Sequence, residues 1–210
     1  MIHKRVLILS PHTDDGEISA GGAIVRFIEE GKDVFYVAFS SCEKSVEKNF
    51  PGDILKKECK LATGVLGIDN SDNILLDYEV REFPHLRQEI LEDMIKLKKD
   101  ICPDLVITPS SFDTHQDHQV IYNETLRAFK KSASIFGMEH PWNNLNFRTD
   151  IFIELNEAQV MKKIDALKQY TSQNKKDYFD EKYLRAHLFT RGMNIGVKYA
   201  EVFECIRLKL

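Results

Sequence analysis

The 210-residue sequence lacks the features of several broad protein classes. Its four cysteines are scattered and form no C-x-x-C pair, so they favour reduced thiols over a zinc ribbon or a redox-active dithiol. There is no basic excess, because 29 lysines and arginines face 33 acids, and no nucleic-acid partner is indicated. The apolar run near the N-terminus, Val6 to Leu9, is far shorter than the ~20 residues of a membrane span. We therefore expect a cytoplasmic protein without membrane attachment.

Glycine-rich phosphate loops are also missing. The pair Gly21-Gly22 follows an early apolar run, but neither G-x-G-x-x-G nor G-x-x-x-x-G-K-[ST] is present. The neighbouring acids would repel a phosphate unless a cation were bound. The sequence thus disfavours a plain dinucleotide-binding fold, and we expect the two glycines to open the first helix with backbone N–H groups near the site.

Short apolar segments alternate with amphipathic ones along the chain. This alternation predicts an α/β fold, a Rossmann-like, mostly parallel sheet flanked by helices in a single domain over 1–210. Its motif-bearing part is 1–130, and 131–210 is less defined. Ligands of such sheets bind outside the carboxyl ends of the strands, here after Leu9 and Thr108. The predicted strands are 6–10, 34–39, 73–76, 104–108, 151–155 and 199–208, and the predicted helices are 23–31, 54–66, 86–97, 119–131 and 157–170.

The loop after the first strand is rich in acids. Its residues 11–22 include His12, Asp14, Asp15 and Glu17. Three carboxylates beside a buried strand are costly unless they are solvated or bind a cation. His12 and Asp15 are ordinary zinc ligands at a spacing that reaches one ion, which leaves Asp14 as a base. The alternative is a solvated turn in which an aspartate caps the helix.

The loop after the fourth predicted strand carries a similar group. Residues 109–120 include Asp113, His115, Asp117 and His118, and two of the chain's seven histidines fall within these four positions from 115 to 118. His118 is placed to complete the metal coordination that His12 and Asp15 begin in the first loop. His115 and Asp117 would then be supporting or acid/base groups. The alternative is a polar loop in which Asp117 caps the next helix.

Together the two loops predict a catalytic metal held by His12, Asp15 and His118. Three protein ligands plus water are typical of a catalytic rather than a structural zinc site, although Fe²⁺ or another divalent metal would also suit these ligands. The predicted activity is metal-dependent hydrolysis. Three alternatives stay open: hydrolysis of an ester or phosphoester, oxygen chemistry at a two-histidine, one-carboxylate iron site, and a metal-stabilised module that only binds a sugar or nucleotide.

The two motifs resemble those of the PIG-L/LmbE-like family of zinc-dependent N-deacetylases. The family's H-P-D-D motif is similar to His12-Thr13-Asp14-Asp15, and its H-P-D-H motif is similar to residues 115–118. The resemblance covers the chain to about residue 130. It implies that His12, Asp15 and His118 bind zinc and that Asp14 is the general base. It also implies that a protonated His115, oriented by Asp117, stabilises the oxyanion or acts as an acid.

The chain departs from the family pattern at three positions. Thr13 and Gln116 stand where proline is usual, and Leu55 stands where the second helix often carries a substrate-binding arginine. The resemblance implies a small-molecule substrate, an N-acylated amino sugar or a conjugate of one, with acetyl as the expected acyl group, and it allows assembly into homo-oligomers. Candidate substrate contacts after the fourth predicted helix are Arg148, Trp142 and His140.

Overall fold

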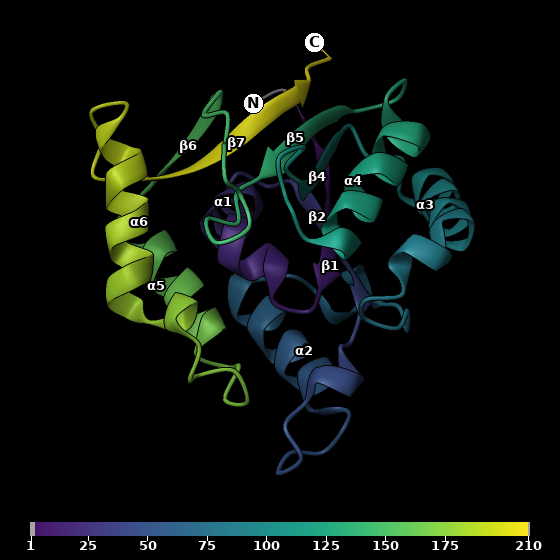
Figure 1. The fold of residues 1–210 in the computed structure, drawn as a ribbon. Helices are drawn as coiled ribbons and strands as arrows, with labels where there is room; N and C mark the ends of the chain where they lie inside the picture. Colours follow the sequence, from purple (N-terminus) through teal and green to yellow (C-terminus); the bar gives the residue numbers. More distant parts are fainter. Residues whose placement is uncertain (1–2, 210) are drawn as a thin grey trace.

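A mixed sheet of seven strands forms the centre of the protein, in a computed structural model that describes residues 3–209 (Figure 1). The strand order is β3-β2-β1-β4-β5-β7-β6. The strands from β1 to β5 run parallel, whereas β7 is antiparallel to both β5 and β6. The strands are β1 Arg5–His12, β2 Asp33–Ser40, β3 Asn73–Leu75, β4 Leu105–Pro109, β5 Ser134–Met138, β6 Ile151–Leu155 and β7 Tyr199–Arg207. The predicted α/β fold with a mostly parallel sheet is confirmed.

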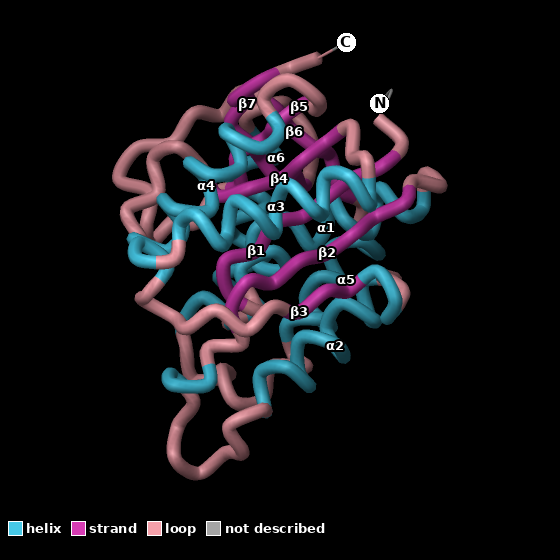
Figure 2. Tube along the Cα trace, turned by 90° about the vertical axis from the view of Figure 1, so that its right-hand side faces the viewer, coloured by secondary structure: helices cyan, strands magenta, loops and turns pink. Residues whose placement is uncertain are grey.

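Six α-helices cover the two faces of this sheet (Figure 2). α1, α2 and α5 pack together on one face, and α3 and α4 pack on the other. Side chains of a strand point alternately to opposite faces, so Val6 and Ile8 join one core cluster while Leu7 and Leu9 join the other. The helices are α1 Asp15–Glu29, α2 Ile54–Leu66, α3 Arg87–Ile101, α4 Gln116–Phe129, α5 Glu157–Leu167 and α6 Glu181–Met193. None of the helices in residues 3–209 has the length and the apolar character that a membrane-spanning helix requires.

The sheet brings the two polar loops together. β1 pairs in parallel with β4, with Leu7 opposite Val106, so the carboxyl ends of both strands lie at the same edge. The chain leaves β1 for α1 and β2 on one side, and leaves β4 for α4 and β5 on the other. This is the point where the strand order reverses, and open α/β sheets bind their ligands there.

One strand and one α-helix of the described chain lie outside the predicted set. β5 has the sequence SIFGM and is fully buried, and its Gly137 is required because a Cβ there would lie 3.0 Å from Ser110 Cα and from Glu204 Oε2. α6 buries only Leu184, Leu188 and Gly192, so its apolar pattern is sparse. Both were missed because neither shows a full apolar period.

The glycine pair has a packing role rather than the predicted one. α1 begins at Asp15, so Gly21 and Gly22 lie in its second turn and not at its start. A Cβ on Gly22 would lie 2.3 Å from Leu155 Cδ1, and one on Gly21 would lie 3.0 Å from Lys163 Cγ. The expectation that these glycines open the helix is wrong, because they allow β6 and α5 to approach α1 closely.

Candidate metal centre

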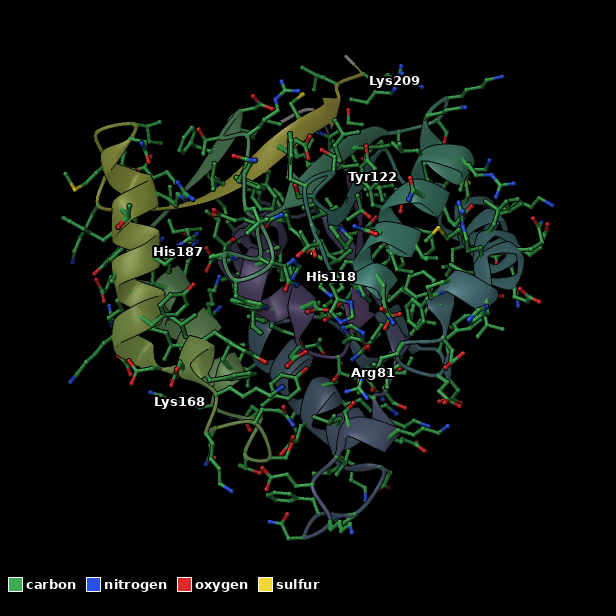
Figure 3. All side chains as sticks on the ribbon, in the orientation of Figure 1. Arg81, His118, Tyr122, Lys168, His187 and Lys209 are labelled. Atoms are coloured by element: carbon green, nitrogen blue, oxygen red, sulfur yellow. The ribbon has the colours of Figure 1, made fainter. Side chains whose placement is uncertain are left out.

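Three side chains from the two loops converge at the carboxyl edge of the sheet. His12 is the last residue of β1, Asp15 is the first residue of α1, and His118 lies in the first turn of α4 (Figure 3). All three are buried, with 9%, 6% and 2% of their surface exposed. Because strand, turn and helix follow one another without a spacer, the backbone itself fixes where these side chains point.

The atoms that face one another are spaced as ligands of one cation. His12 Nδ1 lies 3.0 Å from Asp15 Oδ2 and 3.3 Å from His118 Nε2, and His118 Nε2 lies 3.2 Å from Asp15 Oδ2. Bonds of about 2.0–2.2 Å in a tetrahedral site separate the ligand atoms by about 3.3–3.6 Å. The observed spacing is therefore compatible with a zinc ion bound among these three atoms.

The far nitrogen of each imidazole is held by a second carboxylate. His12 Nε2 lies 3.1 Å from Asp117 Oδ2, and His118 Nδ1 lies 2.7 Å from Asp113 Oδ2. Such outer carboxylates fix the ring orientation and raise the basicity of a metal-binding histidine. Sequence analysis assigned no role to Asp113, although its place in the same acidic loop was a usable signal.

The electrostatics of the centre also favour a cation. Burial alone would lower the pKa of His12, but the carboxylates of Asp15 and Asp117 outweigh it and raise that pKa to about 10. Asp15 and Asp113 likewise overcome burial at His118 and raise its pKa to about 9. The metal-free centre thus holds protons where a divalent ion would sit, and the set of two imidazoles and a carboxylate fits zinc.

His115 and Asp117 are arranged differently from the expectation. The Asp117 carboxylate contacts His12, and only the Asp117 backbone N–H reaches His115, donating to Nδ1 at 3.2 Å. Burial, together with the nearby His118 and His12, lowers the pKa of His115 to about 4. The Asp117 side chain therefore does not orient His115, contrary to the expectation, because its carboxylate faces His12. The lowered pKa favours a neutral His115 imidazole at neutral pH, with Nδ1 accepting from the Asp117 N–H and the proton on Nε2.

His140 lies behind the centre and not in the substrate path. Its side chain is fully buried, its ring centroid is 4.8 Å from that of His118, and its Nδ1 is 3.2 Å from Asp113 Oδ2 without the alignment of a hydrogen bond. The ring is covered by the protein and does not line the cavity, so the structure gives no support to the expected substrate contact. Two further groups have ligand atoms within 4.8 Å of one another, His12 with His115 and His118, and Asp15 with His118 and His140.

A cavity of about 350 Å³ opens onto the centre. Asp14 lines it half-buried and makes no capping hydrogen bond to α1, which disfavours the solvated-cap alternative. Burial and the charge of Asp15 raise the pKa of Asp14, against the opposing effect of Lys176. The other lining residues are His12, Thr13, Asp15, Ile18, Cys42, Ser45, Leu55, Val80, Arg81, His115, His118, Trp142, Asn143, Gln173, Lys176 and Tyr178.

The remaining predicted substrate contacts have different locations. Trp142 lines the cavity and stacks on Tyr178 with ring centroids 4.2 Å apart and planes 16° from parallel. Arg148 is exposed, pairs with Asp150 at 3.3 Å and does not line the cavity, so the structure gives no support to its expected substrate contact. Leu55 does line the cavity, which leaves an apolar surface where the related family often has an arginine.

Comparisons with known proteins agree with this geometry. Residues 7–129 match the PIG-L family, described as GlcNAc-PI de-N-acetylase. A diacetylchitobiose deacetylase from Thermococcus kodakarensis is 25% identical over 221 residues, which cover 94% of this chain and 81% of the relative. An uncharacterised deacetylase of Escherichia coli is 28% identical over 175 residues, which cover 80% of this chain and 91% of the relative.

Solved structures share the fold at lower identity. An N,N'-diacetylchitobiose deacetylase from Pyrococcus horikoshii superposes with a TM-score of 0.80 and 22% identity, covering 97% of this chain and 84% of its own. The family match extends over more than half of the sequence, from within β1 to the end of α4. It therefore includes both loops of the metal centre. The chain belongs to the PIG-L (LmbE-like) family of deacetylases.

Proposed function

We propose that this protein is a zinc-dependent N-deacetylase that removes an acyl group, in the first instance acetyl, from an N-acylated amino sugar or a conjugate of one. The observation that carries the proposal is the convergence of His12 Nδ1, Asp15 Oδ2 and His118 Nε2 within 3.0–3.3 Å beside an unengaged Asp14. The Thermococcus relative, named as a diacetylchitobiose deacetylase, supports the sugar part of the proposal.

His12, Asp15 and His118 would hold the metal. A bound zinc ion supplies Lewis acidity and lowers the pKa of water toward about 7. Asp117 and Asp113 keep the two imidazoles turned toward the ion through their far nitrogens. Both imidazoles must lose a proton before they can bind the ion, so metal occupancy depends on pH.

Asp14 acts as the general base. Its carboxylate lies in the cavity wall, and burial with the adjacent Asp15 raises its pKa toward the working pH, where a base is most effective. Asp14 takes a proton from the attacking water as the water oxygen bonds to the amide carbon. It returns that proton to the nitrogen as the C–N bond breaks, which gives acetate and a free amine.

His115 stabilises the oxyanion as a neutral donor. Its Nδ1 is occupied by the Asp117 N–H, so the Nε2–H is the group available to the cavity that His115 lines. This hydrogen bond strengthens as negative charge develops on the carbonyl oxygen. Removal of one such donor typically lowers kcat by about 10²- to 10³-fold.

The cavity wall suits a sugar ring. Trp142 and Tyr178 form a stacked aromatic surface, and Asn143 and Gln173 add amide groups beside it. Aromatic faces bury the apolar C–H surface of a ring, while amides bond its hydroxyls. The volume of about 350 Å³ fits a ligand the size of an N-acetylated monosaccharide or disaccharide unit.

The proposal is tested by measuring acetate and free amine from a panel of N-acetylglucosamine conjugates, with and without a chelator. We expect release that chelator abolishes and zinc restores, and that Asp14→Asn abolishes while zinc content stays unchanged. Binding of panel members without any release would instead indicate a binding module. Oxygen consumption with Fe²⁺ and no acetate would indicate an oxygenase, and release from esters alone would indicate an esterase.

A further inference from the structure

The backbone of Arg81 has a conformation that residues other than glycine rarely adopt. Its φ is +74°, in the left-handed region, in the turn that precedes the short helix Phe83–His85. Glycine would take this conformation without steric cost, so the presence of arginine requires compensating contacts. Strained residues of this kind cluster at functional sites.

One of those contacts links Arg81 to the metal centre through a single residue, Asp117. The Arg81 N–H donates to Asp117 Oδ2 at 2.7 Å, and the same oxygen lies 3.1 Å from His12 Nε2. The other oxygen of Asp117, Oδ1, is buried and has no hydrogen-bond partner within the described chain. The Asp117 carboxylate is therefore oriented by two donors only, and Arg81 supplies the one that does not belong to the metal ligand.

The conformation of Arg81 is itself held by a departure from the family pattern. Gln116, which stands where proline is usual, donates from Nε2 to the Arg81 carbonyl at 3.0 Å. Proline has no side-chain donor and could not form this bond. In the same segment, the ring of the buried Phe83 lies against the His12 ring, with ring centroids 6.1 Å apart. The segment thus acts on His12 both through Asp117 and through this ring contact.

The side chain of Arg81 meets the cavity. It is exposed and lines the cavity with Asp14 and Trp142, and its guanidinium has no carboxylate partner among the residues that the structure describes. A guanidinium without a protein partner retains its donors for acceptor oxygens of a ligand. Arg81 is the arginine among the described residues that line this cavity, and the Leu55 position in α2 contributes an apolar side chain to the same wall.

We infer that Arg81 has two functions: its backbone, fixed by Gln116, positions Asp117 and thereby the metal ligand His12, and its guanidinium binds acceptor oxygens of the substrate. The second function rests on the proposed deacetylase activity, whereas the first concerns zinc affinity and requires no turnover. Arg81 is thus a positioning residue for the metal centre and a contact for the substrate.

Two substitutions separate the functions. Arg81→Ala keeps the N–H and removes the guanidinium, so KM should rise about 10- to 100-fold while kcat and zinc affinity stay within about twofold. Gln116→Ala removes the bond to the Arg81 carbonyl, so the zinc Kd should rise about tenfold while KM at saturating zinc is unchanged. Gln116 is exposed, so its truncation costs little packing, and Gln88→Ala, in an exposed glutamine bonded only to Glu92, is the matched control.

Zinc affinity is measured on the metal-free protein by competition with a chromophoric chelator, and KM and kcat are measured on a conjugate that the panel identifies. Arg81→Pro, which removes the N–H and the positive φ together, should weaken zinc binding more than Gln116→Ala does. Equal zinc affinity in the Gln116→Ala and Gln88→Ala proteins overturns the positioning role. An unchanged KM in Arg81→Ala overturns the substrate role. If no panel member is turned over by the unsubstituted protein, the proposed function fails, while the zinc affinities still decide the positioning role.

Discussion

Zinc binding to the metal-free protein should release about two protons at neutral pH. The pKa of His12 is raised to about 10 and that of His118 to about 9, mainly because the carboxylate of Asp15 outweighs the effect of burial. At pH 7 each imidazole is then about 99% or more protonated, and each must lose its proton to bind the metal. Unperturbed imidazoles with a pKa of about 6.5 would together release only about 0.5 proton.

The sign of the pH dependence follows from the same shifts. Below about pH 9 both imidazoles are protonated, so zinc affinity should fall about 100-fold for each pH unit toward acid. In the metal-free fold these raised pKa values stabilise the native state below about pH 6.5, and that stabilisation is lost as the pH rises through 9 and 10. Bound zinc replaces the protons and removes this loss.

Isothermal titration calorimetry with zinc at pH 7, in buffers of different ionisation enthalpy, gives the number of protons released. Ionisation of a bound water with a pKa of about 7 adds up to about 0.5 proton, so we expect about 2 to 2.5 protons released per zinc. A value below about one proton would show that the carboxylates do not hold the imidazoles charged, and the electrostatic reasoning would be wrong.

Three further substitutions test separate parts of the account. Asp14→Asn should lower kcat by about 10²- to 10⁴-fold with zinc content unchanged by elemental analysis, because the base is lost and the ligands are not. Lys163→Met leaves the buried Glu201 without its ammonium partner at 2.5 Å, and urea unfolding should show a loss of about 3–5 kcal/mol. Gly22→Ala places a methyl group against Leu155 and should cost about 1–3 kcal/mol by the same assay, and an unchanged stability would contradict the packing account.

The sequence predicted the part of the site that follows from strand order. The strands β1 and β4 could be predicted from their apolar runs, because central parallel strands are buried on both faces. Ligands of such sheets bind at the carboxyl ends of the strands, which placed His12, Asp15 and His118 at one edge. Their convergence required only that β1 and β4 be neighbours. The polar residues that follow each strand supplied the chemistry.

Contacts between residues far apart in the chain could not be predicted from the sequence. Asp117 was expected to orient His115, its neighbour but one, but its carboxylate bonds to His12 across 105 positions. Arg148 and His140 were placed by loop composition, which does not distinguish an exposed ion pair or a buried ring from a cavity contact. The left-handed backbone of Arg81 likewise carries no sequence signal, because its hydrogen bonds with Gln116 and Asp117 join residues 35 and 36 positions apart.

The proposed chemistry depends on one zinc ion shared by His12, Asp15 and His118. Sharing of the ion is tested on crystals of the zinc-loaded protein, with anomalous diffraction recorded on both sides of the zinc absorption edge. We expect a single peak about 2.0–2.2 Å from His12 Nδ1, Asp15 Oδ2 and His118 Nε2. A peak bonded instead to His115 or His140 without His12, or no peak in this cavity, would contradict it.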